Sequence, residues 1–314
     1  MTRPVISVCV ATYNQVGLIE RCLRSILEQE VVADVQVMVG DDASTDGTSE
    51  VLEKLAAENG SRLLHLRRAR NMGAIANISD LLGRAQGDFI ARVDGDDFWL
   101  PGKLSRQLEF FANHPECDAV YTNAITVDAS GMRCGVFNDV GDEQIDLARL
   151  LRRGNFLNNS SVLFRAMDRP GWASSIEQID YQVHLWQAQR GRLGHIGEPL
   201  TAYRLNSQGS MILSANAHVR ELYWRAIQSV PRDLVTDDDY AHGITDFLRR
   251  VFFRSVRTRD PELLRTWGAR VYAASPYRTG RTTALVVANI MRMMGKMLVG
   301  QLRGRDHRNV LYRR

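Results

Sequence analysis

The stretch from Phe89 to Asp97 constrains the fold most, because it is a short apolar run that ends in three carboxylates. A run of this length predicts a buried parallel strand. Asp94 and Asp96 are two positions apart, so their side chains point to the same side of an extended chain. Carboxylates crowded in this way repel one another unless a positive group lies among them. Mg²⁺ and Mn²⁺ suit such a pair, since they take one or two carboxylates plus substrate phosphates. An acidic turn in which Asp97 caps the next helix is the alternative.

Apolar runs alternate with amphipathic segments through the first third of the chain. Strands are expected at 5–11, 35–39, 63–66 and 89–93, with helices around 19–27, 51–55, 71–85 and 103–113. This alternation predicts an α/β protein with a Rossmann-like, mostly parallel central sheet covered by helices on both faces. Ligands bind such sheets at the carboxyl ends of the strands. The loops at 12–14, 40–47 and 94–97 lie there and carry most of the polar residues of this half.

The pattern is less regular after residue 115. Strands are expected at 119–122, 124–127, 161–164 and 198–204, and a helix at 180–189. A hairpin-like turn is expected at 129–131 and a polar loop at 155–160. Beyond about residue 211 the pattern is helical to the end of the chain.

Charge is distributed unevenly along the chain, although the net charge is only +4. Residues 241–314 hold 16 Lys and Arg against 4 Asp and Glu, whereas the first 240 residues hold 24 against 32. This asymmetry predicts an acidic body and a basic tail that could meet an anionic surface. The tail lacks interleaved aromatic residues, which argues against nucleic acid as a partner.

The cysteines and the hydropathy pattern suggest a cytoplasmic protein. The four cysteines lack Cys-x-x-Cys spacing, so free thiols in a reducing compartment are expected. We expect no signal peptide, because the first four residues lead straight into a strand. We also expect no spanning helix, because no uncharged apolar run of about 18 residues is present.

The segment 281–314 is predicted to be an amphipathic helix. Asn289, Arg292, Lys296 and Arg303 share one stripe of a helical wheel, and apolar residues occupy the other side. Such a helix can lie on the inner face of an anionic membrane. Packing on the rest of the chain or on a second subunit of a homodimer is the alternative.

Six short segments occur in order along roughly the first 210 residues: Ala11–Asn14, Asp41–Thr48, Asn71–Gly73, Val93–Asp97, Ile179–Trp186 and Glu198–Arg204. Together they resemble the motifs of family 2 glycosyltransferases, which have the GT-A fold. The resemblance implies a catalytic domain over 1–212, with a nucleotide-binding half at 1–115 and an acceptor half at 116–212. Residues 213–314 then form a separate basic, helical region.

The resemblance implies an inverting, Mn²⁺- or Mg²⁺-dependent enzyme of polysaccharide or glycolipid assembly. It would transfer a sugar from a nucleotide-sugar donor, with UDP or dTDP favoured, to a hydroxyl of a saccharide or lipid-linked saccharide acceptor. The implied catalytic base is Asp180, with Glu177 as the alternative, and the implied metal ligands are Asp96 and Asp94. The implied nucleotide contacts are Thr12, Tyr13, Asn14, Asp42, Asn71, Gly73, Asp94 and Arg204.

Each role has a structural alternative. Tyr13 could pack on the sheet edge, Asp42 could be a turn residue, and Asp180 could only cap a helix. The family often has Glu-Asp where this chain has Ile179-Asp180, and it often has histidine where this chain has Asn206. Two other functions stay open: a sugar-1-phosphate nucleotidylyltransferase, and a silent module that binds sugar nucleotides. The first would want a glycine-rich loop after the first strand, which this chain lacks.

Overall fold

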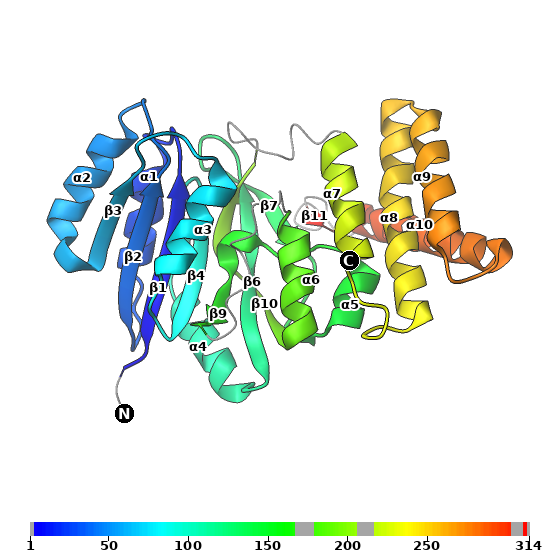
Figure 1. Ribbon diagram of the computed structural model, residues 1–314, viewed down its shortest axis with the longest axis horizontal. Coiled ribbons are helices and arrows are strands. Elements are labelled where there is room, and N and C mark those ends of the chain that lie inside the picture. Colours follow the sequence, from blue (N-terminus) through cyan, green and yellow to red (C-terminus); the bar gives the residue numbers. More distant parts are fainter. Residues whose placement is uncertain (1–2, 167–178, 206–216, 303–309, 313–314) are drawn as a thin grey trace.

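The computed structural model describes residues 3–166, 179–205, 217–302 and 310–312, with side chains omitted at 300–302 (Figure 1). The first half contains β1 (Val5–Thr12), α1 (Ile19–Leu27), β2 (Asp34–Asp41), α2 (Thr48–Asn59), β3 (Leu63–Arg67), α3 (Ala74–Arg84), β4 (Phe89–Asp94), β5 (Phe98–Trp99) and α4 (Lys103–Asn113). The second half contains β6 (Cys117–Val127), β7 (Arg133–Asn138), β8 (Glu143–Ile145), α5 (Leu147–Arg153), β9 (Leu163–Arg165), α6 (Asp180–Arg190) and β10 (Arg192–Arg204). The C-terminal region contains α7 (Ala217–Gln228), α8 (Asp237–Thr258), α9 (Pro261–Ala274), α10 (Thr279–Leu302) and β11 (Val310–Tyr312).

One mixed sheet organises the molecule, with strand order β11-β7-β6-β9-β4-β1-β2-β3 along its main path. The four N-terminal strands β3, β2, β1 and β4 are mutually parallel, as the sequence predicted. Beyond β4 the sheet is mixed, because β9 pairs antiparallel to both β4 and β6. The carboxyl ends of β1, β2 and β4 therefore meet at one edge.

Helices cover the sheet on both faces, and each face has its own apolar core. Ile6, Val8 and Val10 of β1 point into the cluster that includes α1, α2 and α4. Cys9 points to the other face, into the cluster that includes α3, α5 and α6. This alternation follows from the two-residue period of a strand and confirms the predicted α/β class.

The strand β6 differs from the sequence prediction. The strands expected at 119–122 and 124–127 are a single strand, β6. The side chain of Asn123, which suggested a break, is buried and pairs with the backbone of Asn138: its Nδ2 donates to the carbonyl at 3.0 Å, and its Oδ1 accepts from the N–H at 3.1 Å. A polar side chain satisfied in this way is compatible with a continuous strand.

The end of the chain also differs, since it was predicted to be entirely helical. Val310–Tyr312 instead forms β11, which pairs parallel with β7. The Tyr312 ring packs on Phe137 with centroids 4.9 Å apart. The free edge of β7 lies far away in the sequence, so local patterning did not reveal this partner.

The C-terminal helices share a core with the sheet. The ring of Tyr223 in α7 stacks on Tyr181 in α6 at 4.4 Å. Trp224, Phe247 and Trp267 pack together across α7, α8 and α9. The same apolar cluster continues into α3, α5 and α6. The predicted boundary near residue 212 falls in 206–216, outside the described residues.

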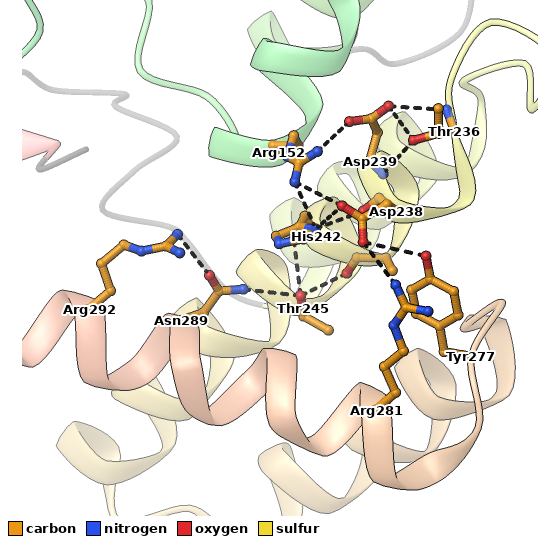
Figure 2. A network of polar contacts seen from close by, with 11 residues as sticks. Arg152, Thr236, Asp238, Asp239, His242, Thr245, Tyr277, Arg281, Asn289 and Arg292 are labelled. Carbon is orange, nitrogen blue, oxygen red and sulfur yellow. Dashed lines mark hydrogen bonds and ion pairs between the residues drawn. The ribbon is translucent and has the colours of Figure 1, made fainter.

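One residue of the predicted polar stripe, Asn289, fixes the last helix, α10, against α8. Asn289 is buried and donates to Thr245 Oγ1 of α8 at 3.0 Å (Figure 2). The opposite face exposes Val287, Met291 and Leu298.

The stretch Thr279–Val299 is 11% buried, reaches a mean hydropathy of 1.2 and is long enough to cross a membrane. The sequence predicted no spanning helix because no fully uncharged apolar run of that length is present. A helix that carries two charged residues can nevertheless be long and apolar enough to span. Length and composition of this kind also occur in interfacial helices and in core helices.

Candidate functional site

Hydrogen bonds join the loops that follow β1 and β2. Asn14, at φ 52°, donates its N–H to Ser44 Oγ at 2.9 Å, and its Oδ1 accepts from Thr45 N–H at 2.9 Å. Asp46 accepts from Val16 N–H at 3.0 Å and from the N–H of Thr48, in the first turn of α2, at 3.0 Å. Asp46 therefore stabilises the start of α2 and ties it to the first loop.

Thr12 and Tyr13 lie at the same edge in different surroundings. Thr12 is buried, and its hydroxyl donates to Gln15 Oε1 at 2.7 Å. Tyr13 is 46% exposed, so its ring is available to a ligand. Asn71 lies beside this edge in the loop before α3, where its Oδ1 accepts from Gly73 N–H at 3.1 Å.

Asp42 anchors the loop between β3 and α3. The carboxylate is buried, and its two oxygens accept from the N–H groups of Met72 and Gly73, each at 2.8 Å. Gly73 has a φ of 87°, a conformation that strongly favours glycine. Each carboxylate oxygen can accept a second hydrogen bond, so this structural role leaves capacity for a ligand.

The acidic turn after β4 lies against the β1 loop. Gly95 donates its N–H to Ala11 O at 2.9 Å, and Asp97 donates its N–H to Asp94 O at 3.0 Å. A Cβ at Gly95 would lie 2.5 Å from Gln15 Oε1, so a side chain there would displace the β1 loop. The turn thus holds the carboxylates close to the loops that carry the other predicted nucleotide contacts.

Asp97 is buried, unlike Asp94 and Asp96. Burial raises the pKa of Asp97 well above its ordinary value, and the nearby carboxylates Asp96 and Asp94 raise it further. Its Oδ1 accepts from Arg204 N–H at 2.9 Å, whereas its Oδ2 has no hydrogen-bond partner among the described residues. This crowding of carboxylates fits a cation at the site.

Arg204 is buried and holds the acidic turn in place. Its Nε donates to the carbonyl of Asp96 at 3.1 Å, and NH1 donates to the carbonyls of Asp128 and Ala129 at 2.8 and 3.0 Å. The guanidinium therefore joins β10, the acidic turn and the β6–β7 turn. The structure gives this predicted nucleotide contact a positioning role.

Arg92 connects two predicted site residues from different halves of the chain. Its NH2 lies 3.4 Å from Asp94 Oδ1, and its NH1 lies 3.7 Å from Asp180 Oδ1. The Arg92 side chain is only 17% exposed, whereas those of Asp94 and Asp180 are 41% and 44% exposed. Both carboxylates thus lie beside one guanidinium at the mouth of the site.

The polar loop before β9 supports the same carboxylates. Asn159 Nδ2 donates to Asp180 Oδ1 at 2.7 Å. Ser160 Oγ accepts from Asp94 N–H at 3.2 Å, and its carbonyl accepts from Trp99 Nε1 at 3.0 Å. The loop therefore fixes Asp180 relative to the acidic turn.

The sequence motifs did not identify Arg92, Asn159 and Ser160 as site residues. A cation inside an otherwise apolar strand was the available signal for Arg92, since it lies two positions before Asp94 and so on the same side of β4. The available signal for Asn159 and Ser160 was a run of four polar residues at 158–161. The structure shows that all four are buried.

His184 lies one turn beyond Asp180 and is fully buried. Its ring packs edge-on against Tyr121 with centroids 4.9 Å apart, and its Nδ1 lies 3.0 Å from Asn155 Oδ1. The amide oxygen can only accept, so Nδ1 carries the proton. Burial, with the Arg92 charge adding to it, lowers the pKa of His184 to about 3. This histidine is therefore a neutral part of the core.

The donor set at the acidic turn fits a divalent ion that also binds substrate phosphates. Within the described ranges no group of three or more His, Cys, Asp or Glu side chains could hold a metal ion. Asp94 and Asp96 are the carboxylates at the turn that are not fully buried. Mg²⁺ and Mn²⁺ sites commonly take one or two carboxylates and complete their shell with phosphates and water. Glu177 and Asn206 lie outside the described residues.

Residues 7–159 match the model of the family described as Glycosyl transferase family 2. An uncharacterized protein of Mycobacterium tuberculosis is 29% identical over 208 residues, 65% of this chain and 59% of the relative. Hyaluronan synthase of Pasteurella multocida is 33% identical over 241 residues, 76% of this chain and 24% of the synthase. The chain thus spans only part of the length of these relatives.

Two solved structures share the fold. The complex of S. aureus TarS 1–349 with UDP-GlcNAc aligns with a TM-score of 0.64 at 21% identity, over 97% of this chain and 88% of that chain. Mannosyltransferase PcManGT from Pyrobaculum calidifontis, in complex with GDP-Man and Mn²⁺, aligns with a TM-score of 0.56 at 18% identity, over 98% of this chain and 85% of that chain. The match over residues 7–159 thus relates this part of the chain to glycosyl transferase family 2, and the likeness to the two solved structures shows that the chain has the GT-A fold.

Proposed function

We propose that this protein is an inverting, divalent-metal-dependent glycosyltransferase of polysaccharide or glycolipid assembly. It transfers a sugar from a nucleoside-diphosphate sugar to an acceptor hydroxyl. The observation that carries the proposal is the bridge made by Arg92, which lies 3.4 Å from Asp94 and 3.7 Å from Asp180. A donor-side carboxylate and a candidate base thus lie beside the same guanidinium. This proximity supports a single displacement, which needs both groups near the reacting sugar.

The donor binds across the loops at the ends of β1, β2 and β4. The exposed ring of Tyr13 contacts the nucleotide, and Thr12, Asn14 and Asn71 shape the pocket around it. Asp42 accepts the imide N–H of uracil or thymine with its remaining acceptor capacity, which favours UDP or dTDP. The UDP-GlcNAc complex of TarS supports a uridine donor, although PcManGT holds GDP-Man.

Asp94 and Asp96 would hold the Mn²⁺ or Mg²⁺ ion. A divalent ion bound there stabilises the negative charge that develops on the leaving nucleoside diphosphate. The Mn²⁺ in the PcManGT complex supports this cofactor. Arg204 keeps the turn in place through the carbonyl of Asp96.

Asp180 is the base that takes the proton from the acceptor hydroxyl. Asn159 and Arg92 orient its carboxylate and leave 44% of the side chain exposed to an acceptor. Both contacts are made to Oδ1 of Asp180. The acceptor hydroxyl approaches the exposed part of the carboxylate, or Glu177 shares the role.

The test compares Asp96→Asn with Asp180→Asn, using Asp34→Asn, an exposed residue of β2, as the matched control. Asp96→Asn should lose metal-dependent nucleotide binding and turnover together, because the cation holds the pyrophosphate before and during the reaction. Asp180→Asn should bind nucleotide and metal normally and lose about 10²–10⁴-fold in transfer rate.

Calorimetric titration of UDP with Mn²⁺ and a donor-hydrolysis and transfer assay give the two readouts. Near-parent transfer by Asp180→Asn together with an inactive Glu177→Gln would move the base to Glu177. Normal activity in both variants would refute the proposed mechanism.

A further inference from the structure

A cavity of about 350 Å³ lies between α5, α8 and α10, away from the strand ends that form the donor site. Its walls are Arg149, Arg152, Arg153, His242, Asp246, Arg249, Asn289, Arg292, Met293 and Lys296. Six of these side chains are cationic and one is a carboxylate. Figure 2 shows Arg152 of α5 and Arg292 and Asn289 of α10 around this region.

Carboxylates neutralise part of this charge. Arg152 pairs with Asp238 at 2.9 Å and with Asp239 at 2.7 Å. Arg249 is buried and pairs with Asp246 at 2.7 Å. Arg149 pairs with Glu143. These pairs fix three of the guanidinium groups in the wall.

Arg153 and Arg292 supply the excess positive charge. Within the described part of the chain, neither forms an ion pair with a carboxylate. Burial lowers the pKa of Arg153, and the charges of Arg149 and Arg292 lower it further, whereas the carboxylates of Glu143 and Asp139 raise it. Guanidinium groups that repel one another across a cavity form a favourable environment for an anion.

The α10 wall is held in position. Asn289 is 6% exposed and donates to Thr245 Oγ1 at 3.0 Å, while its Oδ1 accepts from Arg292 NH1 at 3.4 Å. These contacts orient Arg292 along the cavity side of the helix. A site organised in this way loses less conformational freedom when a ligand binds.

We propose that this cavity is a second ligand site, which binds a phosphate or pyrophosphate group. Its volume falls within the range of small-molecule pockets. Planar guanidinium groups bind phosphate oxygens in pairs, and they retain their charge in this setting. The site is separate from the donor pocket, so the inference does not depend on the proposed transferase activity.

The phosphate could come from a soluble molecule or from a lipid headgroup. The outer face of α10 exposes Val287, Met291, Met294 and Leu298 at 52%, 60%, 45% and 60%. These residues form one apolar stripe at helical spacing, on the same helix that supplies Arg292. A helix of this kind could bring the cavity to an anionic bilayer, which makes the lipid source testable.

The first arm titrates inorganic pyrophosphate into the full chain with a chelator present, so that metal-dependent binding at the donor site is absent. Calorimetry should show saturable binding. Arg153→Gln and Arg292→Gln should each weaken it by about tenfold or more, the effect expected when one charged hydrogen bond is lost. Arg257→Gln, which removes an exposed arginine from α8, should leave it unchanged.

The second arm measures sedimentation with vesicles of phosphatidylglycerol and phosphatidylcholine and with vesicles of phosphatidylcholine alone. A headgroup source predicts binding to the anionic vesicles that falls in Arg153→Gln and Arg292→Gln and is competed by pyrophosphate. A soluble source predicts the calorimetric result without vesicle binding.

The proposal is overturned if neither ligand binds, or if Arg257→Gln loses binding as much as the cavity variants. Arg292 is exposed, so its variant keeps the test valid should Arg153→Gln fail to fold.

Discussion

His184 should make the protein sensitive to mild acid. Its pKa is about 3 in the folded chain, because the ring is fully buried near Arg92, and is about 6.5 in an unfolded chain. Below the unfolded value the unfolded state binds a proton that the folded state does not. Stability is therefore lost as the pH falls from about 6.5 toward 3, the window between the two pKa values.

The size of the effect follows from this window. Each pH unit below the unfolded pKa costs about 1.4 kcal/mol, so the free energy of unfolding should fall by about 2 kcal/mol between pH 7 and pH 5 from this residue alone. Other groups contribute to the total, but a comparison of variants isolates the share of His184. Glutamine is a suitable replacement, because its amide can still donate to Asn155.

Urea unfolding followed by tryptophan fluorescence at the two pH values measures the loss. His184→Gln should lose about 2 kcal/mol less than the parent between pH 7 and pH 5. His218→Gln removes an exposed histidine of α7 and should lose as much as the parent. An equal loss in the parent and His184→Gln would refute the reasoning, as would a ring-proton NMR signal from His184 that titrates near pH 6.5.

Two further changes test the donor site. Asp42→Ala removes the acceptor of the Met72 and Gly73 N–H groups and of the proposed pyrimidine contact, so UDP binding should weaken by about 1–3 kcal/mol in calorimetry; unchanged affinity would mean that Asp42 does not contact the nucleotide. Arg204→Lys loses the planar group that joins the carbonyls of Asp96 and Asp128, so it should weaken Mn²⁺-dependent UDP binding while metal-free binding changes less. Equal weakening with and without Mn²⁺ would show that Arg204 does not act through the acidic turn.

Local patterning was sufficient to predict the N-terminal half of the fold. Strands β1 to β4 and the helices between them carry continuous apolar runs and amphipathic faces, which are set by neighbours in the sequence. The acidic turn and the polar strand ends could be predicted for the same reason. The hydrogen bonds from Asn14 N–H to Ser44 Oγ and from Gly95 N–H to the carbonyl of Ala11 confirm that they are neighbours in space.

The contacts that organise the site were not predictable in this way, because they join distant segments. Arg92 and Asp180 are 88 positions apart, yet their side chains lie 3.7 Å from each other. Arg204 matched a motif that suggested nucleotide contact, but its guanidinium donates to backbone carbonyls, which carry no sequence signature. Strand β11 likewise depends on the free edge of β7, which no pattern near residue 310 reveals.

The apolar cluster that joins Trp224, Phe247 and Trp267 to the sheet has a consequence for chimeric proteins. Because residues on both sides of 206–216 are buried against each other, swapping the C-terminal helices for those of a relative would bring together two surfaces that do not match in shape. Recombination between family members at this point should therefore yield poorly soluble hybrids, unless the packing residues of α6 and α7 are exchanged as one block.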